Sequence, residues 1–304
     1  MPVLAVLFVA VVPAVLLVAH HLFTIAVDRR YRGFDVPEPD APDPDVTWMA
    51  RQRFEDVSII SDDGLTLRGS YLAAPSSTNR VVILAHGYRG NAKKDMGIFA
   101  ELYHERFGCN VLLPDARAHG ASEGRYIGFG WPERKDYLRW IDCMIHRHGP
   151  GTSIVLHGLS MGAATVMMTA GERLPDQVAC VVADCGYTSA GAQLRHELRR
   201  MYHLPAFPLL PLASLICKRR AGYAFDEASA LEQVRKGATP ILFIHGGADA
   251  FVPTRMVYPL HDACPAPKAL LIVPGAEHAM SIVDAPDLYA ETVAAFLDQW
   301  MPAN

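Results

Sequence analysis

Ser160 is the residue whose neighbours most strongly predict chemistry. It lies in a Gly-Leu-Ser-Met-Gly turn over residues 158–162, after a run of strand-forming residues and before a run of helix-forming residues. A serine on such a turn is held clear of the sheet, and small residues such as Gly158 and Gly162 give the backbone room. The first amides of the helix favour negative charge at the same point. The turn therefore predicts a nucleophilic serine.

A second Gly-x-Ser-x-Gly sequence, at residues 120–124, lacks these surroundings. Ser122 is followed by residues 125–128, which have no helical period. A nucleophilic serine of this type needs a strand before it and a helix after it. We therefore expect Ser122 to be an ordinary loop residue.

An acid and a base follow two later runs of strand-forming residues. Asp249 comes just after residues 240–245, and His278 comes just after residues 269–273. Catalytic groups on a parallel sheet gather at the carboxyl ends of its strands. A serine hydroxyl needs a base at pH 7, and an aspartate beside that base fixes its tautomer. We expect Ser160, Asp249 and His278 to form a nucleophile, acid and base triad.

Other acids and histidines lie at the same predicted edge. Asp184 ends another strand-like run and could also reach the imidazole of His278, so it remains an alternative to Asp249. Taken singly, Asp249 could be a turn former and His278 a loop histidine. Four further histidines are expected to organise the site by hydrogen bonding: His86, His119, His157 and His245. None shows the paired spacing with acidic partners of a metal site, so we expect no metal and no cofactor.

A glycine-rich loop over residues 84–91 is expected to complete the site. Its sequence, Leu-Ala-His-Gly-Tyr-Arg-Gly-Asn, follows a strand-like run, and glycines such as Gly87 let the backbone pass close to a substrate. The backbone N–H groups of Tyr88 and Met161 can then donate to one negatively charged oxygen. We expect them to form an oxyanion hole.

Short β-branched runs alternate with amphipathic stretches along the rest of the chain, which predicts one α/β domain with a mostly parallel, doubly wound sheet of eight strands. The first two strands are expected to form a hairpin around Asp63 and Gly64. The expected strands cover residues 57–60, 65–73, 81–85, 109–113, 153–157, 178–183, 240–245 and 269–273. The expected helices cover residues 93–107, 132–146, 161–173, 254–262 and 286–300.

Residues 188–234 interrupt this alternation and are expected to form a lid inserted after the sixth strand. They contain six basic residues in two clusters, at positions 195, 199 and 200 and at positions 218 to 220, with the apolar run 204–212 between them. The arginines could rest on anionic lipid headgroups or form the solvated face of lid helices.

Residues 1–27 carry no Asp, Glu, Lys or Arg and are mostly apolar, which predicts a transmembrane anchor. A cleaved signal peptide and a buried core helix are the alternatives. Arginines at positions 29, 30 and 32 follow the apolar stretch, so the positive-inside rule places the rest of the chain on the cytoplasmic side. Residues 28–52, rich in Pro and Asp, are expected to be an extended spacer, and residues 53–304 the catalytic domain.

Composition argues against some classes of function. The net charge is −4, which does not provide the basic surface that nucleic acid requires, so no nucleic-acid partner is expected. The six cysteines lack the paired spacing of a metal site and mostly lie in apolar runs. They are expected to be reduced, buried thiols.

With these motifs the chain resembles the α/β-hydrolase fold family from about residue 53 to its end. The resemblance rests on the turn at Ser160, the His-Gly-Tyr-x-Gly-Asn loop, the Asp-x-Arg-x-His-Gly-x-Ser sequence at residues 115–122, and the two late strand ends. It is closest to bacterial membrane-anchored enzymes grouped with serine aminopeptidase-like and monoglyceride-lipase-like hydrolases. Ala118 departs from the glycine that is frequent there in the family, and this puts no catalytic residue in doubt.

The resemblance implies a serine hydrolase that works through an acyl-enzyme without a cofactor. An anchored domain with an apolar lid suits ester or thioester cleavage of a small-molecule or lipid acyl substrate better than cleavage of a charged peptide. One alternative is a serine aminopeptidase-type peptidase, which would need an acidic group to hold the amino terminus of its substrate. The others are cofactor-free perhydrolysis and a non-catalytic, membrane-anchored binding protein on the same fold.

Overall fold

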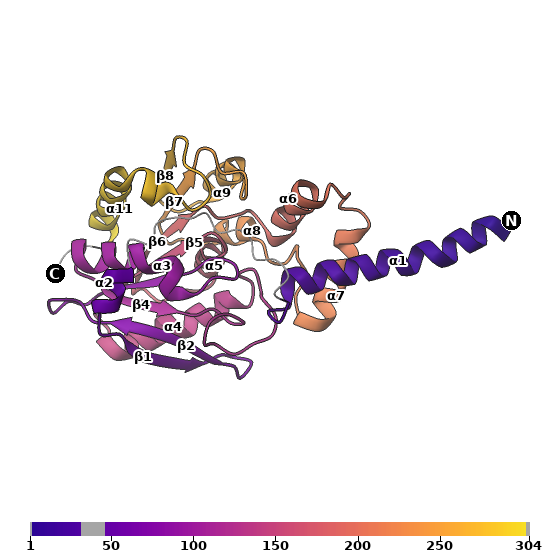
Figure 1. The fold of residues 1–304 in the computed structure, drawn as a ribbon. Helices are drawn as coiled ribbons and strands as arrows, with labels where there is room; N and C mark the ends of the chain where they lie inside the picture. Colours follow the sequence, from indigo (N-terminus) through magenta and orange to yellow (C-terminus); the bar gives the residue numbers. More distant parts are fainter. Residues whose placement is uncertain (1, 32–45, 302–304) are drawn as a thin grey trace.

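The computed structural model describes the secondary structure of residues 2–31 and 46–301, and the side chains of residues 12–31 and 48–301. A central sheet carries helices on both faces, and the N-terminal helix projects from one end (Figure 1). The strands are β1 (Glu55–Ile60), β2 (Thr66–Leu72), β3 (Arg80–Ala85), β4 (Asn110–Pro114), β5 (Ser153–Leu159), β6 (Val178–Asp184), β7 (Ile241–Gly246) and β8 (Lys268–Val273).

The helices match the expected alternation with small shifts at their ends. The helix expected over residues 93–107 is continued by a π-helix, η1, and the helix expected over residues 161–173 ends at Ala170. The helices are α1 (Pro2–Val27), α2 (Val46–Arg51), α3 (Ala92–Glu101), η1 (Leu102–Arg106), α4 (Glu133–His148), α5 (Met161–Ala170), α6 (Ala190–Tyr202), α7 (Leu209–Ala221), α8 (Ala230–Val234), η2 (Thr254–Met256), α9 (Val257–Ala263), α10 (Ser281–Asp284) and α11 (Pro286–Trp300).

The sheet has the order β1-β2-β4-β3-β5-β6-β7-β8. β2 is antiparallel to both β1 and β4, whereas all other neighbouring strands are parallel. The mostly parallel, eight-stranded sheet is thus confirmed. The order of the strands across the sheet reverses at β3, because β4 pairs with one edge of β3 and β5 pairs with the other. At such a switch point the carboxyl ends of the strands leave a crevice, and this is where ligands bind in open α/β sheets.

Both faces of the central strands are buried by helices, and successive residues of a strand point to opposite sides. In β3, Val81 and Ile83 face the layer that contains α4, α5, α8 and α9. Val82 and Leu84 face the layer that contains α2, α3, α10 and α11. This explains why the strands appear in the sequence as continuous apolar runs instead of alternating patterns.

The N-terminal helix differs from the prediction. Within the part of the chain that the structure describes, no helix combines the length and the apolar character that crossing a membrane requires, so the transmembrane anchor predicted over residues 1–27 is not found. The end of α1 is instead packed into the domain, where Ala19, Phe23 and Val27 are at most 1% exposed. A charge-free apolar helix suits a protein interior as well as a bilayer, and its sequence does not distinguish the two.

The predicted spacer over residues 28–52 is ordered at both ends. After α1, the N–H of Arg29 donates to the carbonyl of Arg125 at 3.0 Å, which ties the start of this segment to the domain. At the other end, α2 places Trp48 against α3, with 5% of its surface exposed. Residues 32–45 lie outside the described part of the chain.

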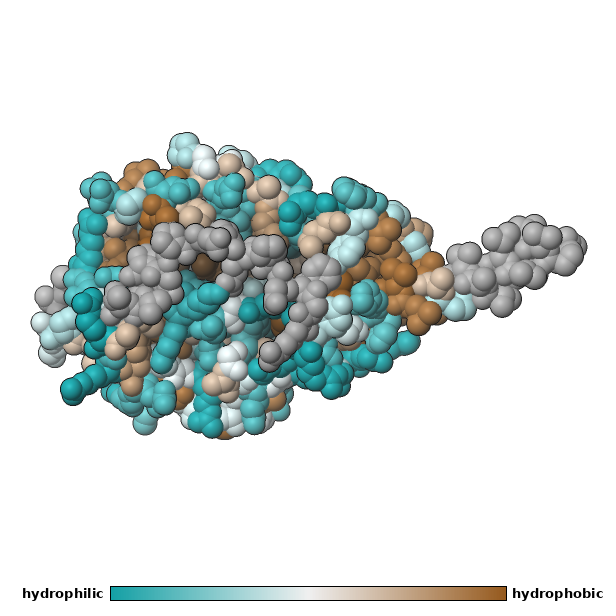
Figure 2. All heavy atoms as spheres, viewed as in Figure 1, coloured by the Kyte–Doolittle hydropathy of each residue, from teal (hydrophilic) through white to brown (hydrophobic). Residues whose placement is uncertain are grey.

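Residues 188–234 leave the sheet between β6 and β7, where the lid was expected. Two of the helices in this stretch are α6 and α7; α7 packs directly against α1 (Figure 1), and α6 contacts α7. The third, α8, packs against α5 and belongs to the layer that covers the sheet. Figure 2 shows hydrophobic side chains gathered where α1 meets these lid helices.

Candidate active site

Ser160 occupies a sharp turn between β5 and α5. Its backbone has φ 57° and ψ −114°, a region that costs energy for any residue other than glycine. The turn is possible because its flanking residues lack side chains: a Cβ at Gly158 would lie 2.2 Å from the carbonyl oxygen of Gly162, and one at Gly162 would lie 1.9 Å from that of Ala85. The predicted turn is therefore present, and it raises the Ser160 hydroxyl above the sheet.

A line of hydrogen bonds joins the three predicted triad residues. The hydroxyl oxygen of Ser160 lies 2.9 Å from Nε2 of His278, and Nδ1 of the same ring lies 2.7 Å from Oδ2 of Asp249. Ser160 is 7% exposed and Asp249 is 5% exposed. Such a line can pass a proton from a hydroxyl to an imidazole whose orientation is fixed by a carboxylate.

The carboxylate of Asp249 is firmly positioned in the loop after β7. Its Oδ1 accepts hydrogen bonds from the backbone N–H groups of Phe251 and Val252, at 2.9 and 2.8 Å. Burial alone would raise the pKa of Asp249, but hydrogen bonds from His245 and His278 lower it to about 2. The group is therefore ionised at neutral pH, which is the state that can stabilise a protonated imidazole.

Asp184, the alternative acid, points elsewhere. Its Oδ2 accepts a hydrogen bond from the hydroxyl of Tyr289 at 2.9 Å, and its Oδ1 has no partner within the described residues. Burial raises its pKa to about 6. The Tyr289 hydroxyl also contacts His157 at 3.1 Å, so Asp184 belongs to a buried polar cluster beneath the site. In the structure His278 is hydrogen-bonded to Asp249 and not to Asp184.

The loop after β3 approaches Ser160 closely. A Cβ added at Gly87 would lie 3.9 Å from the Cβ of Ser160. Tyr88 follows Gly87, and it lines the same pocket as Ser160 and Met161. Tyr88 and Met161 thus both lie beside the serine, and the oxyanion hole at their backbone N–H groups stays a prediction.

His86 and His119 hold this loop against its neighbour, as expected of hydrogen-bonding histidines. Nε2 of His86 accepts from the N–H of Ala116 at 2.9 Å, and Nε2 of His119 accepts from the N–H of Arg89 at 3.1 Å. Burial, together with the nearby His86, lowers the pKa of His119 to about 3. The ring of His119 is therefore neutral at pH 7, as an accepting nitrogen must be.

Ser122 is a structural loop residue, as its surroundings predict. Its hydroxyl donates to the carbonyl of Asp115 at 2.6 Å and accepts from the N–H of Arg68 at 2.8 Å. The loop around it also binds the N-terminal segment, because the guanidinium of Arg29 donates to the carbonyl of Ser122 at 2.8 Å.

Ser160 opens onto a mostly apolar pocket with a cavity volume of about 130 Å³. The lid contributes side chains from α6 and α7, including Leu198 and Leu210, and the loop after β7 contributes Phe251. The end of α1 contributes Leu22, Ile25 and Ala26. An apolar cleft with a few convergent polar groups is the usual form of a small-molecule site.

One group of three side chains has the proximity of a metal site. Cys185, Asp249 and His278 each place one ligand atom within 4.8 Å of the others. Burial raises the pKa of the Cys185 thiol, however, and a metal needs the thiolate. Asp249 and His278 already use the nearest atoms to bond each other, so the cluster is better explained by the proton-transfer line than by a metal.

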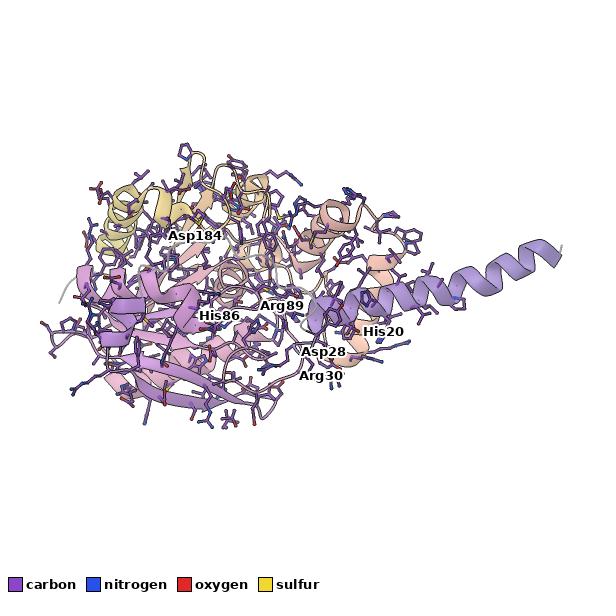
Figure 3. All side chains as sticks on the ribbon, viewed as in Figure 1. His20, Asp28, Arg30, His86, Arg89 and Asp184 are labelled. Carbon is purple, nitrogen blue, oxygen red and sulfur yellow. The ribbon has the colours of Figure 1, made fainter. Side chains whose placement is uncertain are left out.

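Sequence reasoning missed the contribution of α1 and of Arg89. Residues 22–26 belong to the charge-free stretch for which the sequence predicts an anchor, and Arg89 has no motif position of its own. In the structure the guanidinium of Arg89 lies at the end of α1, near Asp28 (Figure 3). The arginines after α1 were the available signal, since Arg29 bonds the loop that contains Ser122.

Comparison with known proteins places this geometry in context. Residues 80–205 match the family described as alpha/beta hydrolase fold. The Bacillus subtilis protein YqkD, described as uncharacterized, is 36% identical over 238 residues, which cover 77% of this chain and 76% of YqkD. The Pyrococcus furiosus esterase Pf2001 has a TM-score of 0.66 at 23% identity, covering 84% of this chain and 94% of that one. Est1E from Butyrivibrio proteoclasticus, solved with ferulic acid, has a TM-score of 0.61 at 19% identity. The match covers 81% of this chain and 99% of Est1E. The two structures share the fold of this chain.

Proposed function

This chain is an enzyme of the α/β-hydrolase family, and we propose that it is a serine hydrolase in which Ser160 attacks the carbonyl carbon of an ester or a thioester. The observation that carries the proposal is the unbroken hydrogen-bonded line from Ser160 through His278 to Asp249, at the wall of an apolar pocket. With Nδ1 of His278 donating to Asp249, Nε2 is free to accept the serine proton.

The reaction then follows from the positions of these groups. As the Ser160 oxygen bonds the carbonyl carbon, its proton passes to Nε2 of His278, and the N–H groups of Tyr88 and Met161 hold the oxyanion. The intermediate collapses when the imidazolium gives its proton to the departing alcohol or thiol, leaving an acyl group on Ser160. Water, deprotonated by His278, releases the acid and restores the serine.

The pocket favours an acyl substrate over a peptide. The acidic side chain that lines it, Glu197, accepts two hydrogen bonds from Arg200, at 3.1 and 2.8 Å. A peptidase that holds a charged amino terminus would need an acid free to pair with it. Because Glu197 is already paired and most of the other lining residues are apolar, an uncharged acyl chain suits this pocket better.

Hydrolysis of p-nitrophenyl acetate, butyrate and palmitate by the full-length protein tests the proposal. The chain offers a matched control, since Ser160 and Ser122 both occupy Gly-x-Ser-x-Gly sequences. We expect Ser160→Ala to lose more than about 10³-fold in kcat, and Ser122→Ala to remain active. A folded wild-type protein that hydrolyses none of the esters would contradict the proposal and favour a binding protein on the same fold.

A further inference from the structure

The helix that begins the chain forms a wall of the Ser160 pocket. Leu22, Ile25 and Ala26 lie on successive turns of its last part, and all three line the cavity that contains Ser160 and Met161. α1 also packs against α7 of the lid. The wall is therefore built from the N-terminus and the lid together, so an acyl chain leaving Ser160 meets α1.

The end of α1 is fixed by the residues that follow Gly87. Carbonyl groups in the last turn of a helix have no partner within the helix. Here the hydroxyl of Tyr88 donates to the carbonyl of Ala26 at 2.8 Å, and the guanidinium of Arg89 donates to that of Ile25 at 2.8 Å and to that of Tyr31. A positive charge at a helix C-terminus is favourable.

Tyr88 therefore connects two parts of the site through one side chain. Its backbone N–H is the proposed oxyanion donor, whereas its hydroxyl bonds α1. Nε of Arg89 donates to the same hydroxyl at 2.9 Å, which fixes the ring between the two. The Tyr88 side chain thus extends from the loop beside Ser160 to the last turn of α1.

The segment after α1 keeps this arrangement in place. The N–H of Arg29 donates to the carbonyl of Arg125 at 3.0 Å, and the carboxylate of Asp28, 4% exposed, pairs with the guanidinium of Arg125 at 2.9 Å. Burial would raise the pKa of Asp28, but the hydrogen bonds from Arg30 and Arg125 lower it to about 2, so the pair stays charged at neutral pH. The end of α1 is thus anchored on the catalytic domain from both sides.

We propose that α1 is the element that selects the acyl chain, with Leu22 as a specificity-determining residue for long chains. This inference rests on the proposed acyl transfer to Ser160, and it adds that the N-terminal helix binds the distal part of the acyl group. Short acyl groups are bound without α1, and long ones lie along it.

The test compares two positions on the same helix of the full-length chain. Leu22 faces the pocket, whereas Leu17 is 68% exposed, so Leu17→Trp is the matched control for Leu22→Trp. The quantity measured is kcat/KM for p-nitrophenyl dodecanoate divided by that for p-nitrophenyl acetate. We expect the ratio to fall about tenfold or more in Leu22→Trp, to fall severalfold in Leu22→Ala through lost contact, and to stay within about twofold in Leu17→Trp.

A binding measurement separates this inference from the proposed chemistry. Dodecanoic acid is titrated into three proteins: the Ser160→Ala variant, and the same variant with either Leu22→Trp or Leu17→Trp added. Binding of the acid does not depend on catalysis, so the Ser160→Ala background is suitable. We expect Leu22→Trp to raise the Kd about tenfold and Leu17→Trp to leave it unchanged. If esters are hydrolysed but neither the ratio nor the Kd responds to substitution of Leu22, the inference is overturned and the proposed function stands. If no ester is hydrolysed but the Kd responds, the proposed function fails and α1 remains the binding wall.

Discussion

The hydroxyl of Tyr88 donates a hydrogen bond to the carbonyl oxygen of Ala26 at 2.8 Å, across 62 residues of sequence. Tyr88 belongs to the loop that approaches Ser160, and Ala26 lies in the last turn of α1. The N-terminal helix and the candidate active site therefore share one hydrogen-bonded side chain.

Phe23 and Leu17 lie on the same helix and are expected to differ sharply on substitution. Phe23 is 1% exposed and its ring lies 5.8 Å from that of Tyr126, whereas Leu17 is 68% exposed. Phe23→Ala should lower the free energy of unfolding by about 3 kcal/mol or more, and Leu17→Ala by less than about 0.5 kcal/mol. Urea unfolding measures both. Equal, small effects would show that α1 is independent of the domain.

Tyr88→Phe removes one hydroxyl and leaves the backbone N–H in place. The bond to Ala26 is lost, which should lower the free energy of unfolding by about 1 kcal/mol. Turnover of p-nitrophenyl acetate should change little, because the proposed oxyanion donor is the amide and not the phenol. A loss of kcat as large as about 10²-fold, typical for a missing oxyanion donor, would assign the hydroxyl a direct role.

Asp249→Asn is expected to impose the wrong tautomer on His278. The N–H groups of Phe251 and Val252 need an acceptor at the Oδ1 position, so the amide oxygen will take it and the NH₂ group will face Nδ1 of His278. Nε2 must then carry the proton and cannot accept from Ser160. We predict a fall in kcat of about 10⁴-fold, measured by steady-state ester hydrolysis on protein that unfolds at a similar temperature. A loss of less than about tenfold would remove Asp249 from the mechanism.

Asp184→Asn provides the matched control and a pH-dependent signature. Burial raises the pKa of Asp184 from 3.8 to about 6, so between these pH values the folded chain holds a proton that the unfolded chain has released. The free energy of unfolding therefore falls as pH rises through this window, by about 3 kcal/mol for this shift. Asparagine does not titrate and stays neutral, so the stability of the variant relative to wild type should be higher at pH 7.5 than at pH 4. A stability difference between variant and wild type that does not change with pH would contradict a buried, protonated Asp184. As the control for Asp249→Asn, the Asp184→Asn variant should still hydrolyse esters.

The sequence predicted the site better than it predicted the chain that surrounds it. Ser160 follows β5 directly, and Asp249 and His278 lie in the loops after β7 and β8, so local patterns located them. Parallel pairing of β5, β6, β7 and β8 brought the ends of these strands to one edge. Asp184 also ends a strand, and only the direction of its side chain, toward Tyr289, distinguishes it from Asp249. No local pattern encodes that direction.

The position of α1 could not be predicted for a related reason. An apolar helix is typical of both a membrane span and a buried protein interior, and the contacts that decide between them are long-range. The bond from Arg89 to Ile25 spans 64 residues. The charged residues after the helix were correctly noticed, but their partners, Arg125 for Asp28 and the Ser122 carbonyl for Arg29, lie about a hundred residues away.

Covalent labelling of Ser160 tests the central claim most directly. The full-length protein, Ser160→Ala and Ser122→Ala are treated with a fluorophosphonate, digested and analysed by mass spectrometry. A single adduct on the peptide that contains Ser160, present in wild type and Ser122→Ala and absent in Ser160→Ala, is the predicted result. A folded wild-type protein that carries no adduct, or carries it on another residue, would contradict the assignment of Ser160 as the nucleophile.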